Sequence, residues 1–326
     1  MIERRSLLAL TALALIPSRV RAQQPGKVAR VGLLGPGPPF TDTNPFVAGL
    51  SRGFAKRGYA VGTNLVFESR AAQGKVNLLP QFVGELMASH VELLITFSYP
   101  AALAAKEHSS VPVVVAYSGD PVATHLAASL ARPGGNVTGV SEIATELSAK
   151  RLQLMKEAVP SLRKIAMLWN ADDLGMTLRY GAADAAAKQL GVTVQALGVR
   201  EPDDFNNAFT AMDKDPPDGL LMVTDVLTLL NRKRVFEYAA AHKLPAMFEA
   251  DNLVREGGLM SYGPDGGEVL DHVAGLADRI LKGAKPADLP LEEPTRFIFA
   301  INMKTAAALG LTIPPAILAR ADDVIE

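Results

Sequence analysis

Aromatic and short polar side chains recur in this sequence just after runs of apolar residues. The chain has 12 Phe, 6 Tyr and 1 Trp, and seven of these rings stand at such positions. Aromatic faces combined with Ser, Thr, Asp and Asn suit a flat or apolar small molecule with polar ends. The candidate ligand-binding residues are Phe40, Thr41, Phe97, Ser98, Tyr99, Tyr117, Asp120, Asn170, Asp225, Glu249 and Tyr262.

Some of these positions also suggest which charged group they would bind. Ser98 and Tyr99 precede Pro100 at the start of an expected helix, where free backbone N–H groups would bind a carboxylate. Asp225 is the best candidate for binding an ammonium group, and Asp120 is a second candidate. Either aspartate has the alternative of capping a helix, which is the commoner use of Asp at such a position. The aromatic residues have the alternative of covering the core at strand ends.

Signals for catalysis, metal binding or a cofactor are weak. The five histidines do not have the spacing of metal ligands. The chain has no Cys, no G-x-S-x-G motif, and neither a Walker A nor a G-x-G-x-x-G motif. The acidic pairs 172–173 and 203–204 fall where loops and helix starts are expected. We therefore expect no catalytic residue, no metal and no cofactor, and predict that the protein is not an enzyme.

The segments that would hold the candidate residues alternate between strand and helix. In the first part of the chain the expected strands are 28–34, 65–68, 91–96 and 111–116, and the expected helices are 44–57, 78–89 and 100–108. Asn44 is a typical helix cap, and Gly58 a typical stop. This alternation predicts βαβ units and a parallel sheet. Ligands of such sheets bind beyond the carboxyl ends of the strands, where the candidate residues stand.

The same alternation restarts after Pro133-Gly134-Gly135-Asn136. Here the expected strands are 165–169, 192–197, 220–224, 246–248 and 297–301, and the expected helices are 148–159, 176–190, 205–212, 229–242 and 269–281. The two parts contain loose copies of a strand, a helix and a Pro-led strand, although any two βαβ units look alike. We interpret 136–142 and 259–264 as crossings between two lobes, and 286–294 as a connector rich in Pro and acidic residues.

The length of 326 residues suits two lobes. We predict an α/β fold of two Rossmann-like lobes with parallel sheets, a hinge and a central cleft. The N-terminal lobe would comprise 23–140 plus 264–292, and the C-terminal lobe 141–263 plus 293–326. The formal net charge is -1, and no Lys/Arg-rich patch is interleaved with aromatic residues, so we expect no nucleic-acid partner.

Residues 1–22 have the three parts of a secretory signal peptide. Arg4 and Arg5 form a basic start, 6–16 an apolar run, and 20–22 a cleavage site of small residues around Arg21. The run is too short to span a bilayer, which needs about 20 residues. We predict export to the periplasm without stable membrane insertion, and both the general secretory and the twin-arginine routes stay open. The alternative is a cytosolic protein with an apolar N-terminal helix.

Several longer motifs resemble the tryptophan-binding type of ABC transporter substrate-binding protein. They are 119–122, 130–139, 257–263, 280–290 and 309–315, and the likeness extends from Val28 to the C-terminus. The resemblance implies a type I periplasmic-binding fold that closes over a ligand, with an inner-membrane permease and its ATPase as partners. Some members of the family bind aromatic amino acids. At 97–99 this chain departs from the small residues usual in the family, so a tryptophan ligand is not carried over.

The sequence therefore predicts a monomeric, periplasmic solute-binding protein of an ABC import system. Its ligand would be a small molecule, either an amino acid or an aromatic or aliphatic carboxylate. One alternative is a periplasmic sensing module that presents its closed state to a receptor. Another is a secreted hydrolase or isomerase, which would need a carboxylate or His in the cleft acting on the substrate.

Overall fold

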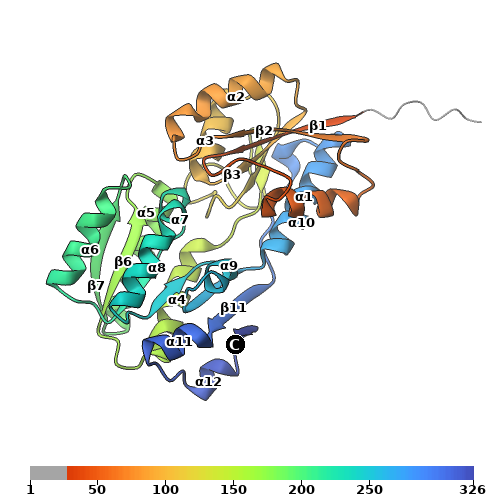
Figure 1. Ribbon diagram of the computed structural model, residues 1–326. Helices are drawn as coiled ribbons and strands as arrows, with labels where there is room; N and C mark the ends of the chain where they lie inside the picture. The colour runs from red at the N-terminus through yellow and green to blue at the C-terminus, as the bar shows by residue number, and fades with distance from the viewer. Residues whose placement is uncertain (1–27) are drawn as a thin grey trace, which may run out of the picture.

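The computed structural model describes residues 28–326, whose strands form two sheets (Figure 1). The α/β class predicted from the alternating pattern is confirmed. The expected signal peptide, residues 1–22, lies outside the described residues. Within 28–326, no helix is both long enough and apolar enough to cross a membrane.

The first sheet is parallel and has the strand order β2-β1-β3-β4-β5. Its strands are β1 (Ala29–Gly35), β2 (Leu65–Ala71), β3 (Leu93–Phe97), β4 (Val113–Ala116) and β5 (Val137–Gly139). One face packs against α1 (Pro45–Ala55) and α10 (Gly266–Leu281). The other face packs against α2 (Leu79–Ala88) and α3 (Tyr99–His108). Both faces are covered by helices, which explains the nearly continuous apolar character of these strands.

The second sheet has the order β12-β11-β10-β9-β8-β6-β7. Its strands are β6 (Lys164–Asn170), β7 (Thr193–Val199), β8 (Gly219–Met222), β9 (Ala246–Phe248), β10 (Met260–Pro264), β11 (Phe297–Asn302) and β12 (Asp323–Ile325). One face packs against α4 (Ala144–Ala158), α5 (Leu174–Gln189), α11 (Met303–Leu309) and α12 (Pro315–Leu318). The other face packs against α6 (Asp204–Lys214), α8 (Arg232–Ala241) and α9 (Asp251–Arg255). The helix α7 (Val226–Leu230) follows β8, and short 3₁₀ helices occupy Val76–Leu78 and Pro286–Asp288.

Strand β11 runs antiparallel to its neighbour β10, whereas the other pairs of the second sheet are parallel. After β10 the chain leaves this sheet and forms α10, which packs on the first sheet. It then returns to the second sheet from the side of the first. Because β11 starts at the end where β10 finishes, the two strands must run in opposite directions.

Three segments differ from their sequence-based predictions. The segment 136–142, expected as a crossing, contains strand β5 of the first sheet. The segment 259–264, expected as a crossing, first forms strand β10 and only then passes to the first sheet. The expected helix 229–242 is two helices, α7 and α8, which meet at Asn231. A capping box between Asp225 and Thr228 starts α7 before the predicted boundary. The predicted cap of α1 is confirmed, since Asn44 Oδ1 accepts a hydrogen bond from the Phe46 N–H at 2.9 Å.

Candidate functional site

The carboxyl ends of the strands in the two sheets face each other across one interface. A methyl group placed on Gly37, in the loop after β1, would lie 4.0 Å from Val226 Cγ2 at the start of α7. A methyl group on Gly175, in the first turn of α5, would lie 3.8 Å from the Ser118 carbonyl oxygen after β4. The strand ends selected from the sequence therefore lie at the boundary between the two lobes.

Four aromatic rings pack together at the carboxyl edge of the first sheet. Phe46 lies with its ring centroid 4.8 Å from that of Phe97 and 5.1 Å from that of Tyr117. Phe40 joins the group with its centroid 5.3 Å from that of Phe97. Three of the four rings were predicted as site residues, and Phe46, on α1, was not. The group forms an apolar wall that includes the ends of β3 and β4.

The backbone is strained at two of the predicted residues. Ser98 has φ 89° and ψ 160°, a region that residues other than Gly rarely adopt. Tyr117 has φ 52°, in the left-handed region, and its hydroxyl donates to the Gly266 carbonyl oxygen at 3.3 Å. Burial raises the pKa of the Tyr117 hydroxyl, so this group stays protonated. Strain of this kind concentrates at ligand clamps and switch regions.

Buried hydroxyl groups without hydrogen-bond partners gather at the carboxyl edges of both sheets. Within the described residues, no partner is present for the buried hydroxyl oxygens of Thr96, Ser98, Ser118 and Thr224. Thr96 and Ser118 are fully buried. A buried polar group without a partner costs roughly 1–3 kcal/mol, so these positions require an explanation.

The two aspartates predicted to bind an ammonium group cap local structure. Asp225 Oδ1 accepts from the Thr228 N–H at 2.8 Å, and Asn170 Nδ2 donates to Asp225 Oδ2 at 2.6 Å. Asp120 Oδ1 accepts from the backbone N–H groups of Val122 and Ala123, both at 3.1 Å. The hydrogen bonds of both aspartates therefore agree with the alternative role, in which they cap local structure.

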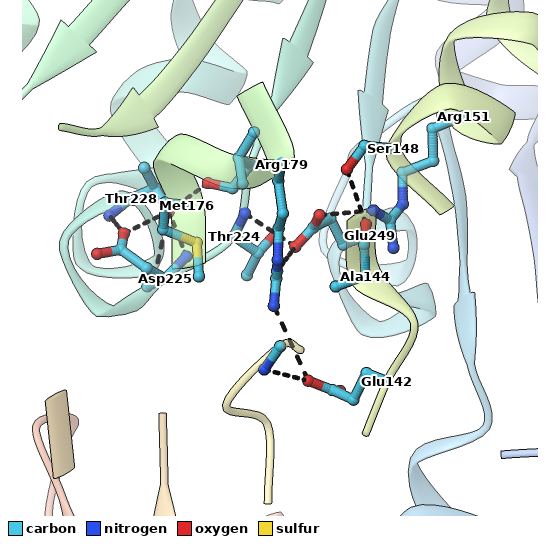
Figure 2. A network of polar contacts seen from close by, with 12 residues as sticks. Glu142, Ala144, Ser148, Arg151, Met176, Arg179, Thr224, Asp225, Thr228 and Glu249 are labelled. Atoms are coloured by element: carbon cyan, nitrogen blue, oxygen red, sulfur yellow. Dashed lines mark hydrogen bonds and ion pairs between the residues drawn. The ribbon is translucent and has the colours of Figure 1, made fainter. Parts of the chain in front are cut away.

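Glu249 lies at the centre of a buried ion-pair network in the second lobe (Figure 2). Arg151 Nη1 on α4 donates to Glu249 Oε1 at 2.6 Å, and Arg179 Nη1 on α5 donates to Glu249 Oε2 at 2.7 Å. Arg151 Nε also donates to the Tyr262 carbonyl oxygen at 2.7 Å, and the Thr224 N–H to Glu249 Oε2 at 3.0 Å. Glu249 and Tyr262 are thus joined to Thr224 through one network.

The network reaches the first lobe through Glu142 (Figure 2). Arg179 Nη2 lies 3.9 Å from Glu142 Oε2, and the same oxygen accepts the Gly119 N–H at 3.2 Å. A methyl group on Gly119, whose φ is +77°, would lie only 3.0 Å from Arg179 Nη2. Burial raises the pKa of the Glu142 carboxyl group despite the nearby Arg179 guanidinium. The absence of a side chain at Gly119 lets the loop after β4 pack on Arg179.

Asp173 is a buried carboxylate at the same boundary. It caps α5, with its Oδ1 accepting from the Met176 N–H at 3.2 Å, and is only 3% exposed. Burial, and then repulsion by the Asp225 carboxylate, raises the pKa of Asp173 to about 6. The pKa of Tyr99, across the boundary, is raised by burial and by the charge on Asp173.

Thr41 is the one predicted residue that is exposed, and its hydroxyl lies 3.1 Å from that of Thr43. Glu142, Arg151 and Arg179 were missed by sequence reasoning. A signal existed for both arginines, because each falls on an otherwise apolar helix face, such as Met176, Arg179 and Ala183 on α5. An arginine at such spacing requires a buried anionic partner.

Other features of residues 28–326 lie away from this boundary. In these residues no cluster of three or more His, Asp or Glu is placed to bind a metal ion. A groove of about 600 Å³ lies between α1 and β2, and of the predicted residues it includes Phe40. A smaller cavity of about 260 Å³ lies between α8 and α11, and none of the predicted residues lines it. The unpartnered hydroxyls therefore mark the interlobe boundary as the candidate site.

Comparison with known proteins gives consistent matches. The family model of the ABC transporter substrate binding protein matches residues 43–325. A tyrosine-binding protein of Clostridioides difficile (strain R20291) is 27% identical over 266 residues, covering 80% of this chain and 76% of the relative.

Two solved structures have similar folds. One is an ABC domain in complex with L-Trp from Streptococcus pneumonia, with a TM-score of 0.84 and 26% identity, covering 92% of this chain and 100% of that chain. The other is a conserved domain protein from Vibrio cholerae, with a TM-score of 0.85 and 25% identity, covering 91% and 100%. The family model spans most of the chain, and both lobes have solved counterparts. The chain therefore belongs to the family of ABC transporter substrate-binding proteins, as its motifs indicated.

Proposed function

We propose that this protein is the solute-binding component of an ABC import system in the periplasm and that its two lobes close over an amino acid or an aromatic or aliphatic carboxylate. The lobes would have the boundaries predicted from the sequence, with the crossings as the hinge. A ligand that contacts both lobes would stabilise the closed state through its higher affinity for that state. The partners would be an inner-membrane permease and its ATPase.

The observation that carries this proposal is the set of unpartnered hydroxyls on both sides of the interlobe boundary. Ser98 and Ser118 come from the first lobe and Thr224 from the second. A ligand with polar groups would satisfy hydroxyls from both lobes together, and this would link binding to closure. The strained backbone at Ser98 supports the same location.

The residues around the candidate site support this ligand class. Ser98 stands at the N-terminus of α3, where backbone N–H groups and the helix dipole favour a carboxylate. The rings of Phe97 and Tyr117 would enclose the apolar part of the ligand. Asp225, on the opposite lobe, would face an ammonium group where one is present. A tyrosine-binding relative and an L-Trp complex among the similar structures are consistent with this class.

A thermal-shift screen of residues 23–326 tests the proposal. The panel would contain amino acids, aromatic and aliphatic carboxylates, nucleosides and sugars. A ligand at 100 times its dissociation constant stabilises the folded state by about 2.7 kcal/mol, which gives a readable shift. Stabilisation by amino acids or carboxylates is the expected result, and it should weaken in a Ser98→Ala variant. Stabilisation by sugars or nucleosides alone would contradict the ligand class.

Thr210→Ala is the matched control, because Thr210 is exposed on α6 and its hydroxyl donates to the Asn206 carbonyl oxygen, away from the interlobe boundary. It should leave the shift unchanged. If no compound shifts the melting temperature, mass spectrometry of the denatured sample would show whether a ligand was purified with the protein. A ligand-free sample without any hit would count against the proposal.

A further inference from the structure

We infer that closure of the two lobes is coupled to uptake of a proton by Asp173. The inference rests on the proposed closure and goes beyond it, because it makes pH a regulator of the closed state. Asp173 lies at the boundary between the lobes, where it caps α5, and the sequence analysis gave it no role other than a place in a loop or helix start.

Residues of the first lobe lie close to Asp173, which is only 3% exposed. Gly175, two residues along α5, lies against the loop after β4: a methyl group placed on it would be 3.8 Å from the Ser118 carbonyl oxygen and 3.8 Å from Thr124 Cγ2. Tyr99, at the start of α3, is close enough for the Asp173 charge to act on its hydroxyl. Separation of the lobes would remove these residues and expose the carboxylate to water.

The charges around Asp173 do not compensate its burial. Asp225, which caps α7, repels it, and Tyr99 offers no positive charge. The cation acting on it is Arg179 on its own helix, and Arg179 Nη1 is bound to Glu249. The pKa of Asp173 is about 6 here, against an ordinary value of 3.8.

The direction of the pH effect follows from these two values. Above pH 6 the carboxylate is ionised in both states, so closure must bury a charge. Below pH 6 the closed state binds a proton that an open state with the ordinary Asp pKa of 3.8 does not hold until the pH approaches that value. Since one pKa unit corresponds to a tenfold change in an equilibrium constant, closure should become about tenfold more favourable between pH 7 and pH 5.

A disulfide between the lobes would measure closure without any ligand. The chain contains no Cys, and a side chain on Gly37 would lie 4.0 Å from Val226 Cγ2. The variant Gly37→Cys/Val226→Cys would be oxidised with tetrathionate, and the rate of disulfide formation followed at pH 5 to 8. The same cysteine pair in a protein that also carries Asp173→Asn serves as the reference, because its rate changes with pH only through thiol ionisation and other groups. The Asn side chain keeps the helix cap.

The expected result is that the rate with Asp173, divided by the rate with Asp173→Asn, rises about tenfold from pH 7 to pH 5. A ratio that does not change with pH would overturn the inference. Glu142→Gln is the second control, because Glu142 is also buried at the boundary with a raised pKa. If the pH dependence of the disulfide rate is lost with Glu142→Gln and kept with Asp173→Asn, the assignment to Asp173 is wrong. No disulfide in any variant would contradict the proposed closure itself.

Discussion

Ser98 combines an unfavourable backbone conformation with an unsatisfied side chain. Its φ of 89° and ψ of 160° lie in a region that is open mainly to Gly, and its hydroxyl oxygen is buried without a partner in the described structure. A serine retained in such a position costs stability and gives the folded protein no compensating contact of its own. A bound ligand would supply that contact.

Replacing Ser98 with glycine should therefore separate stability from binding. Ser98→Gly relieves the strain and should raise the free energy of unfolding by about 1 kcal/mol, measured by urea denaturation. It removes the hydroxyl and should weaken ligand binding. Ser98→Ala is the control, since it also lacks the hydroxyl and keeps the strain. Equal stabilities of the two variants would show that the backbone is not strained in solution.

Glu249 is the second residue with a large predicted effect. Glu249→Gln leaves Arg151 and Arg179 buried without a full counter-charge, and loss of one partner from a buried pair costs about 3–5 kcal/mol. Glu256→Gln is the matched control, because the Arg232–Glu256 pair has a similar distance of 2.6 Å and is partly exposed. Its loss should cost less than about 1 kcal/mol. Similar unfolding free energies for the two variants would contradict the role given to burial.

The predictions of individual site residues depended on where the strands were expected to end. It placed Phe97, Tyr117 and Asn170 at strand ends because apolar runs stop there, and the structure has strands ending at or just before these residues. It did not reveal that Arg179 and Glu142 meet, because they lie 37 positions apart and on different elements. Such a pairing depends on how the segment between β5 and α4 packs against α5 and not on local spacing.

At the scale of elements, the predictions succeeded where periodicity was strong. Helices α1, α2 and α10 have apolar faces at regular spacing, and their predicted ranges overlap those in the structure. The short elements α9, α11, α12 and β12 were not predicted. Three to seven residues carry too little pattern to identify an element, and their positions follow from packing on the second sheet.

Capping provides a test at this scale. Asn44 accepts a hydrogen bond from the first turn of α1, whereas Asp203, at the same position of α6, makes no side-chain cap. Asn44→Ala should lower the free energy of unfolding by about 1 kcal/mol. Asp203→Ala should stay within about 0.5 kcal/mol of the wild type. Chemical denaturation of the two variants measures both, and a larger loss for Asp203→Ala would contradict the assignment.

At the scale of the whole molecule, the chain passes between the two sheets after β5, after β10 and before β11 (Figure 1). Residue 140 forms a bridge to Glu292, so two of these passages lie side by side. In the proposed closure these connections would be the hinge about which one lobe rotates against the other. Such a rotation would separate Gly37 from Val226 and break the hydrogen bond from the Gly119 N–H to Glu142 Oε2.

Small-angle X-ray scattering of the protein with and without a ligand found in the thermal-shift screen tests ligand-driven closure most directly. The unliganded protein should have a larger radius of gyration than the structure described here, because its lobes separate in solution. Saturation with ligand should reduce the radius and give a curve that matches this structure. Binding that leaves the scattering curve unchanged would contradict closure of the lobes over the ligand.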